Sequence, residues 1–244
     1  MFTIFKKEIS SYFSSITGYV VMILLLTLLW LLVWIYPDYN VFDTGYATLD
    51  PFFYFAPWIF IFLIPAITMK SFSEEIKSGT IELLSTRPIT DLKIILGKYF
   101  ASLFLIAFSL LPTLIYFYAV YQLGAPIGNM DTGATWGSYI GLILLCAAFV
   151  SIGIFASSIT SNQIVAFITA VFLSYFTYDA FFRLSKLNFF AGSFETLVQN
   201  LGISYHYQSI SRGVVDTRDV LYFISFSVLF ILLTKTSLQT RKWK

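Results

Sequence analysis

Two neighbouring stretches decide the fold: "PFFYFAPWIFIFLIPAITM" at residues 51–69 and "EEIKSGTIELLSTRPITDLKIILGK" at residues 74–98. The first contains no charged residue, whereas the second holds eight of the chain's 15 basic and 13 acidic residues. A long uncharged run followed at once by a charged one is typical of a helix that crosses a bilayer and then enters water. The pair predicts a membrane protein with a polar segment attached directly to one of its spans.

The composition of all 244 residues agrees with this class. Hydrophobic residues make up 58% of the chain and charged residues 11%, against roughly 45–50% and 25% in soluble domains. The 27 Phe, 16 Tyr and 5 Trp leave too little polar surface for a water-soluble globule. The net charge of +2 is too small to predict nucleic-acid binding.

The residues that could carry chemistry are few. One cysteine, Cys146, and one histidine, His206, allow neither an intramolecular disulfide nor a zinc site of the usual His/Cys type. His206 lies outside the predicted spans, so no serine–histidine pair is available within the bilayer, and the spans hold no paired aspartates. No GxxxxGK[ST] phosphate-binding loop is present. We therefore expect a non-catalytic protein with no metal and no cofactor.

The uncharged runs predict six spans in a single domain of residues 1–244. Residues 132–178 carry no charge, and one helix of that length would extend about 70 Å, twice the ~30 Å hydrocarbon core. The chain must turn within this run, and "SSITSNQ" at 157–163 is its polar cluster. The six expected spans lie at about residues 18–36, 51–70, 97–122, 136–159, 163–182 and 219–238.

The basic residues predict the orientation. The amino end, the 70–98 segment and the carboxyl end carry 11 of the 15 Lys and Arg, whereas the 37–50 and 123–135 loops carry only acids. By the positive-inside rule, both termini and the charged segment lie in the cytoplasm, with the spans in a bacterial inner membrane. Residues 1–14, beginning "MFTIFKKEISSYF", space aromatic and aliphatic side chains along one side. They predict an interfacial helix on the inner leaflet, with a frayed basic tail as the alternative.

The predicted outer side offers weaker candidates. Segment 183–218 is too long for a structureless loop, and its apolar spacing predicts short helices at the outer leaflet. Asp179 would lie at the end of a span, where an acid is a candidate for substrate contact, but the i,i+4 spacing to Arg183 favours a local ion pair. His206 in "YHYQ" suggests aromatic recognition or metal capture, although an interfacial aromatic belt fits better.

The charged segment itself predicts two short helices and the start of a third span. Ser71 and Glu74 match a capping box, and Gly79 is a natural helix stop. Thr80 can restart a helix that Pro88 ends. Composition alone leaves two interpretations open. The segment is either a compact cytoplasmic element to which a soluble partner binds, or the polar loop that any multispan protein needs.

The same segment resembles the signature of the type-2 ABC exporter permeases. That signature has an acidic residue, Gly-Thr, Glu-Leu-Leu, a following Pro, and Gly-Lys at the start of the third span. The matching residues are Glu75, Gly79, Thr80, Glu82, Leu83, Leu84, Pro88, Gly97 and Lys98. The stretch "YHYQSISRGVVDTRDVLYFISFSVLF" at 205–230 resembles the narrower branch that contains the gliding-motility ABC transporter permease.

The resemblance implies an all-α permease subunit of an ATP-driven exporter, with six transmembrane helices, an N-terminal interfacial helix and a cytoplasmic coupling helix between spans 2 and 3. A separate ATP-binding subunit would hydrolyse ATP and receive the coupling helix. The implied contact residues are Glu74, Glu75, Gly79, Thr80, Ile81, Glu82, Leu83, Leu84, Arg87 and Pro88. A second permease subunit with a large periplasmic part, or otherwise an identical chain, would complete the pathway.

Three alternatives remain open beside the gliding-motility type. They are a permease of copper-enzyme maturation, an exporter of lipid or drug-like molecules, and a membrane scaffold that transports nothing. The transported substrate and the direction of transport have no signature in the sequence.

Overall fold

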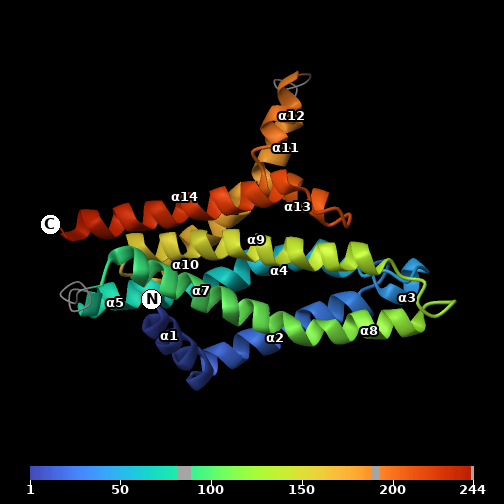
Figure 1. Ribbon diagram of the computed structural model, residues 1–244, viewed down its shortest axis with the longest axis horizontal. Coiled ribbons are helices and arrows are strands. Elements are labelled where there is room, and N and C mark those ends of the chain that lie inside the picture. Colours follow the sequence, from blue (N-terminus) through green and yellow to red (C-terminus); the bar gives the residue numbers. More distant parts are fainter. Residues whose placement is uncertain (82–88, 188–192, 243–244) are drawn as a thin grey trace.

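Helices account for most of the computed structural model, which describes residues 1–81, 89–187 and 193–242 (Figure 1). No strand occurs among these described residues, so the predicted all-α class is confirmed. In chain order the elements are α1 (Phe2–Ser14), α2 (Ile16–Trp34), α3 (Val41–Thr44), α4 (Asp50–Thr68), α5 (Lys70–Lys77), α7 (Asp91–Leu110), η1 (Leu111–Thr113), α8 (Leu114–Leu123), α9 (Thr132–Ile159), α10 (Gln163–Tyr175), η2 (Phe176–Ala180), α11 (Phe181–Ser185), α12 (Ser193–Gln199), α13 (Ile203–Ile210) and α14 (Thr217–Lys242).

Five helical segments of the described chain are long and apolar enough to cross a bilayer. They are Asp50–Lys77, Asp91–Leu123, Thr132–Ile159, Gln163–Ser185 and Thr217–Thr240. Helices α1 and α2 meet at a bend of 70° and make a sixth candidate if the bent pair counts as one span. The chain is therefore a multi-pass membrane protein with five or six candidate spans.

Helix α9 forms the centre of the bundle. It packs against α4, α10 and α14, and 72% of its most apolar window is buried. In the spans that contain α10 and α14, only 28% of the most apolar 18-residue stretch is buried, so most of their apolar surface faces outward. In a membrane protein that outward surface is the one that lipid covers. The chain leaves helix between Ile159 and Gln163, within the polar turn that the length argument requires.

Helix α4 continues into α5 with an interruption only at Met69, which itself has helical backbone angles. The predicted capping box of Ser71 and Glu74 is therefore wrong. A capping box satisfies the free N–H groups of a helix start, and none are free here because Met69 N–H already donates to the Pro65 carbonyl at 2.8 Å. Ser71 lies inside the α5 helix, where no side chain caps the N-terminus.

Gly79 ends this long helix as predicted. Its φ of +71° places it in the left-handed region that favours glycine. The second short helix that the sequence predicts, from Thr80 to Pro88, falls mainly on residues 82–88, which lie outside the described residues.

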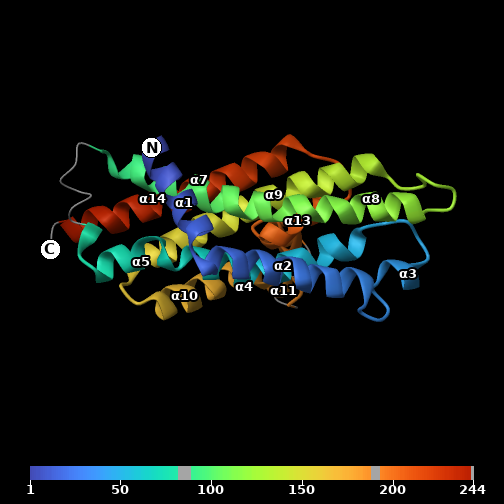
Figure 2. The same ribbon diagram turned by 90° about the horizontal axis from the view of Figure 1, so that it is seen from below.

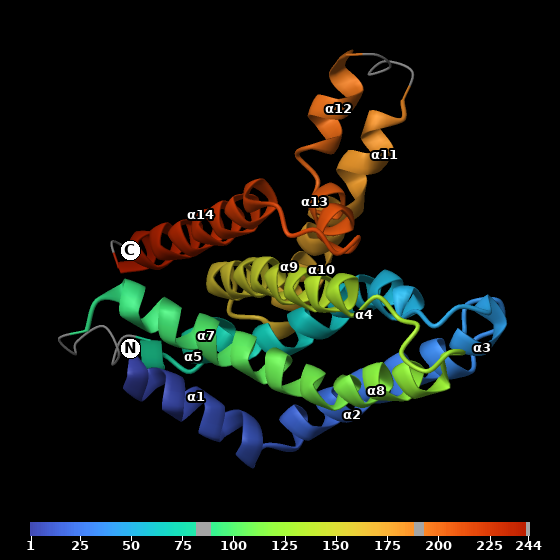
Figure 3. The same cartoon turned by 45° about the vertical axis from the view of Figure 1, so that its right-hand side comes forward.

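The start of α1 and the described end of α14 lie at the same end of the bundle as the end of α5 (Figures 1 and 2). Helix α1 lies along α7 at that end (Figure 3). Among its described residues, segment 183–218 forms the short helices α12 and α13 after the end of α11, so the short helices that the sequence predicts there are confirmed, and their position at the outer leaflet stays a prediction. Helices α11 and α12 pack on each other and project sideways from the bundle, a direction that the sequence pattern does not predict (Figures 1 and 3).

Candidate functional site

The end of α5 presents part of the predicted partner-binding segment. Glu74, Gly79 and Thr80 are exposed, and Ile81 is half-buried against the hydrophobic core. The Ser78 hydroxyl donates to the Glu74 carbonyl at 2.8 Å and lies 2.9 Å from the Thr80 hydroxyl. The Ser78 N–H donates to the same carbonyl at 2.9 Å, and the Thr80 hydroxyl donates to the Glu75 carbonyl at 3.4 Å, so the exposed tip has a defined shape.

The other half of the predicted segment is not part of this description. Glu82, Leu83, Leu84, Arg87 and Pro88 lie outside the described residues. The apolar anchors that the resemblance implies at two of these leucines therefore stay predictions.

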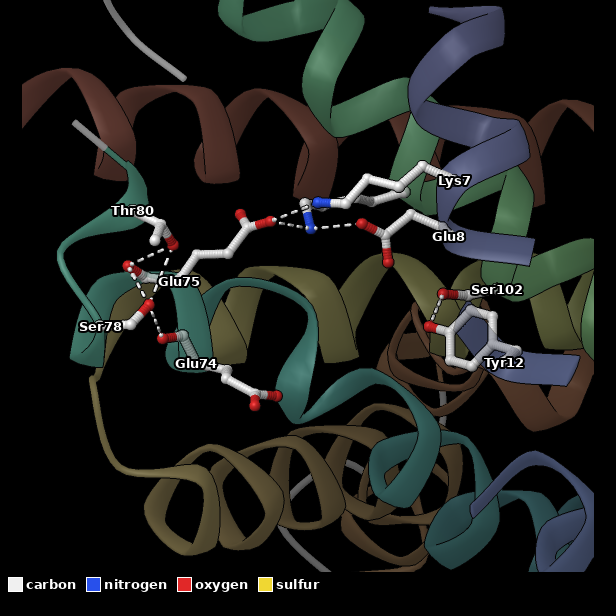
Figure 4. A network of polar contacts seen from close by, with 9 residues as sticks. Lys7, Glu8, Tyr12, Glu74, Glu75, Ser78, Thr80 and Ser102 are labelled. Atoms are coloured by element: carbon white, nitrogen blue, oxygen red, sulfur yellow. Dashed lines mark hydrogen bonds and ion pairs between the residues drawn. The ribbon is translucent and has the colours of Figure 1, made fainter. Parts of the chain in front are cut away.

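Glu75 points inward instead of outward. Its Oε1 lies 2.9 Å from Nζ of Lys98, and the same ammonium group lies 2.9 Å from Oε1 of Glu8 (Figure 4). Only 3% of the Lys98 side chain is exposed, and 15% of each glutamate. Lys7 adds a looser contact of 3.9 Å to Glu75. The three buried charges join α1, α5 and α7 at one point.

The surroundings make this ion network costly to break. The Lys98 ammonium also lies 5.2 Å from the centre of the Phe72 ring, which is fully buried. Taking charges out of water is unfavourable, and removal of one partner leaves another charge buried without compensation. A cavity of about 390 Å³ borders the network and is lined by residues of α1, α2, α4, α5 and α7.

Sequence reasoning identified Lys98 in a motif and Glu75 as a partner contact, but it missed Glu8. A signal was present, because Glu8 is the sole acidic residue in the first 37 positions and sits on an otherwise basic helix. An acid in such a helix weakens its attraction to an anionic membrane surface. Its position therefore indicates a partner within the protein.

Helix α1 also packs closely on α7 beside the ion network. A Cβ atom added at Gly97 would lie 3.0 Å from both Cβ and Cγ2 of Ile4, so glycine permits this approach. The Tyr12 hydroxyl lies 3.1 Å from the Ser102 hydroxyl on the other side of the network. The contact thus extends over two turns of α1.

The opposite end of the bundle holds a larger cavity of about 1150 Å³. Helix α4 contributes Phe53 and Trp58 to its wall, and α13 contributes Tyr207. Tyr207 is buried and donates its hydroxyl to the Phe53 carbonyl at 2.8 Å. That carbonyl has no ladder partner four residues on, because Pro57 lacks an N–H group. Burial raises the pKa of the Tyr207 phenol further above neutral pH, where it is protonated and can donate.

Asp179 and Arg183 also line this cavity, and their side chains form an ion pair. The local pair that their spacing favours is therefore confirmed, and it occupies the carboxylate that sequence reasoning offered to a substrate. The Arg183 side chain is 67% exposed, so the pair contributes little to stability.

His206 serves a structural contact near the start of α14. Its Nδ1 lies 2.7 Å from Oδ1 of Asp219, its Nε2 lies 2.9 Å from the Asn200 carbonyl, and its ring stacks on Tyr222. Both ring nitrogens thus have protein partners. Within the described ranges no group of three or more His, Cys, Asp or Glu side chains is arranged to hold a metal ion.

Comparison with known protein families gives one match. A family model described as "ABC-2 family transporter protein" matches residues 42–240, well over half of the chain. The match includes α4, α5, α7 and the segments that line the larger cavity, whereas α1 precedes it. A search of curated proteins finds no match.

Proposed function

The chain belongs to the ABC-2 family of transporter membrane proteins, and we propose that it is the permease subunit of an exporter driven by a separate ATP-binding subunit. The proposal assigns the exposed end of α5, with Glu74, Gly79 and Thr80, to the contact with that subunit. The following residues 82–88 extend the contact. The chain itself has no phosphate-binding loop, which agrees with ATP hydrolysis on another polypeptide.

The observation that supports this proposal best is the continuity of α4 and α5. One helical run extends from Asp50 to Lys77, which at ~1.5 Å per residue is about 40 Å long. One end of this run leads into the exposed tip, and the other end lines the larger cavity. A displacement of the tip by a docked subunit would therefore reach the cavity through a single helix.

The direction of the bundle follows from the distribution of charge. We propose that the end with α5 and both termini faces the cytoplasm of a bacterial cell, since 11 of the 15 basic residues belong to the segments at that end. The larger cavity then opens toward the periplasmic side. Glu75 takes a different role from the one that the resemblance implies, because its carboxylate is engaged by Lys98. Glu75 holds residues 74–81, which we call the docking segment, in place. Its exposed neighbour Glu74 makes the contact with the ATP-binding subunit.

The narrower assignment to the gliding-motility type rests on the resemblance of residues 205–230 alone. It implies a second permease subunit with a large periplasmic part. An identical second chain would instead favour a homodimeric exporter of lipid or drug-like molecules, or a permease of copper-enzyme maturation. Absence of any ATP-binding partner would favour a membrane scaffold.

Affinity purification of the full chain in mild detergent, with identification of the co-purifying proteins, tests the proposal. We expect an ATP-binding subunit to be captured. The double variant Glu74→Lys with Thr80→Arg should lower that capture, since it reverses one charge and adds a positive one on the exposed tip, outside the buried network. Arg218→Glu, an exposed charge reversal at the far end of α14, is the matched control and should leave capture unchanged.

Two results would contradict the proposal. If the unaltered chain captures no ATP-binding subunit, the permease assignment falls. If the tip variant captures as much as the control, the contact lies elsewhere.

A further inference from the structure

Lys98 holds three helices together from a buried position. We infer that Lys98 is a positioning residue that fixes the N-terminal helix α1 to the docking end of α5, so that α1 moves with the docking segment. This inference rests on the proposed function, because it gives α1 a part in the same contact between the end of α5 and the ATP-binding subunit.

The geometry of Lys98 distinguishes it from an ordinary lysine near a membrane surface. A lysine close to the end of a span usually extends its ammonium group to water. Lys98 instead ends between two carboxylates, each 2.9 Å away, and 3% of its side chain is exposed. One carboxylate comes from Glu8 on α1 and the other from Glu75 on α5, which lie 90 and 23 residues away in the sequence.

The charges of the network are unequal. Two carboxylates face one buried ammonium group, and Lys7, whose side chain is 67% exposed, compensates only at 3.9 Å. Removal of the Lys98 charge would leave two acids that repel each other across the gap between α1 and α5. Removal of the Glu8 charge would leave a balanced pair of Lys98 and Glu75. The first change should release both helices, and the second should release α1 alone.

Packing on α7 supports the same role. Ile4, Glu8 and Tyr12 follow each other at four-residue spacing, which places them on one face of α1. They meet Gly97, Lys98 and Ser102 of α7, respectively. The Gly-Lys pair at the start of the third span thus forms the binding surface for α1. Gly97 leaves room for the helix to approach, and Lys98 binds the Glu8 carboxylate.

This arrangement predicts that α1 behaves differently from an amphipathic helix that is held only by lipid. Such a helix would keep its position when α5 moves, because only lipid would hold it. A helix clamped through Lys98 must follow α5 and must carry the force into α2 through the 70° bend. The N-terminal helix is then a working part of the coupling end.

Spin-label distances test the clamp independently of ATPase binding. In a Cys146→Ala background, nitroxide labels at Lys6→Cys on α1 and Lys77→Cys on α5 report the separation of the two helices in the purified full chain. Both positions are exposed. We expect Lys98→Gln and Glu8→Gln each to broaden the distance distribution. Lys93→Gln, which removes an exposed lysine from the same helix α7, is the control and should leave it unchanged.

A charge-preserving variant separates charge pairing from mere packing. In this variant, Lys98→Arg keeps a cation between the two carboxylates, and the bordering cavity gives the larger side chain room, so it should keep a narrow distribution. With the ATP-binding subunit present, Lys98→Gln and Glu8→Gln should keep capture but lower the permease-dependent ATPase rate about tenfold, the scale of one lost hydrogen bond to a charged group. Lys98→Arg should keep that rate.

The outcomes are distinct. Unchanged distances in both Lys98→Gln and Glu8→Gln overturn the inference, as does a broadening in Lys98→Arg as large as that in Lys98→Gln. Failure of the unaltered chain to capture an ATP-binding subunit refutes the proposed function instead, and the distance measurements still decide whether the clamp exists.

Discussion

The contact between α4 and α9 gives the sharpest test of the bundle itself. A Cβ atom added at Gly153 of α9 would lie 2.0 Å from Oγ1 and 2.8 Å from Cβ of Thr68 on α4. Rotation of the Thr68 side chain can move Oγ1 away, but its Cβ is fixed by the backbone. Thr68 is fully buried, so Gly153→Ala can be accommodated only if the two helices separate.

The size of the effect follows from this distance. An ordinary contact requires 3.4 Å or more, against the available 2.8 Å, so the helices must shift by several tenths of an ångström. Overpacking of this kind costs about 1–3 kcal/mol, while alanine returns up to about 1 kcal/mol of helix propensity. From the middle of the overpacking range, about 2 kcal/mol, this leaves an expected net loss of about 1–2 kcal/mol. At about 2–4 °C per kcal/mol for a chain of this length, the Tm should fall by about 2–8 °C.

The chain carries its own probe for this measurement. Cys146 is the sole cysteine, lies on the same helix α9 and is 1% exposed, so a thiol-reactive fluorophore reports unfolding in detergent. Gly133→Ala is the matched control on α9, since the nearest atom to its Cβ would be 3.4 Å away. Its Tm should stay the same or rise slightly. A Tm for Gly153→Ala at or above that of the unaltered chain would refute the close approach of α4 and α9.

Two further predictions use other parts of the molecule. Tyr207→Phe removes the hydroxyl that donates to the Phe53 carbonyl, so it should cost about 1–3 kcal/mol in the same thermal assay, and an unchanged Tm would show that this bond does not form. For orientation, cysteines that replace Tyr46 or Ile127, which are 78% and 69% exposed, should react with a membrane-impermeant maleimide in intact cells. A cysteine at Thr80 should react only after permeabilisation, and its labelling in intact cells would reverse the proposed topology.

Much of the fold follows from the sequence because bilayer thickness imposes a length scale. Residues 132–178 are too long for one helix, and the turn between Ile159 and Gln163 falls in the polar cluster within them. The continuity of α4 and α5 could not be predicted in this way. Ser71 and Glu74 have the spacing of a capping box, but that motif acts only where N–H groups are free, and local spacing does not report whether the preceding turn is helical.

The candidate site divides along a similar line. Gly79 was predictable as a helix end, because a left-handed residue there favours glycine whatever the tertiary structure. The pairing of Glu75 with Lys98 could not be predicted, because the spacing of charges within one segment does not show which lysine on the next helix will lie near it. The pairing of Glu8 with Lys98 was harder still to predict, because the two residues lie 90 positions apart in the sequence. Long-range pairing of charges depends on how α1 lies on α7, and that depends on the absence of a side chain at Gly97.

The two ends of the α4–α5 run are held by different kinds of interaction, and this difference bears on how a movement would travel. At the docking end, Glu75 is fixed by the Lys98 ion network. At the cavity end, Pro57 removes a backbone hydrogen bond, so the helix can bend there, and Tyr207 takes up the freed Phe53 carbonyl. A push on α5 would travel along this helix past Pro65 and Pro57, each of which removes one backbone hydrogen bond, and Pro57 lies beside the cavity wall. The Tyr207 bond therefore lies where a movement from the docking end would enter the cavity wall.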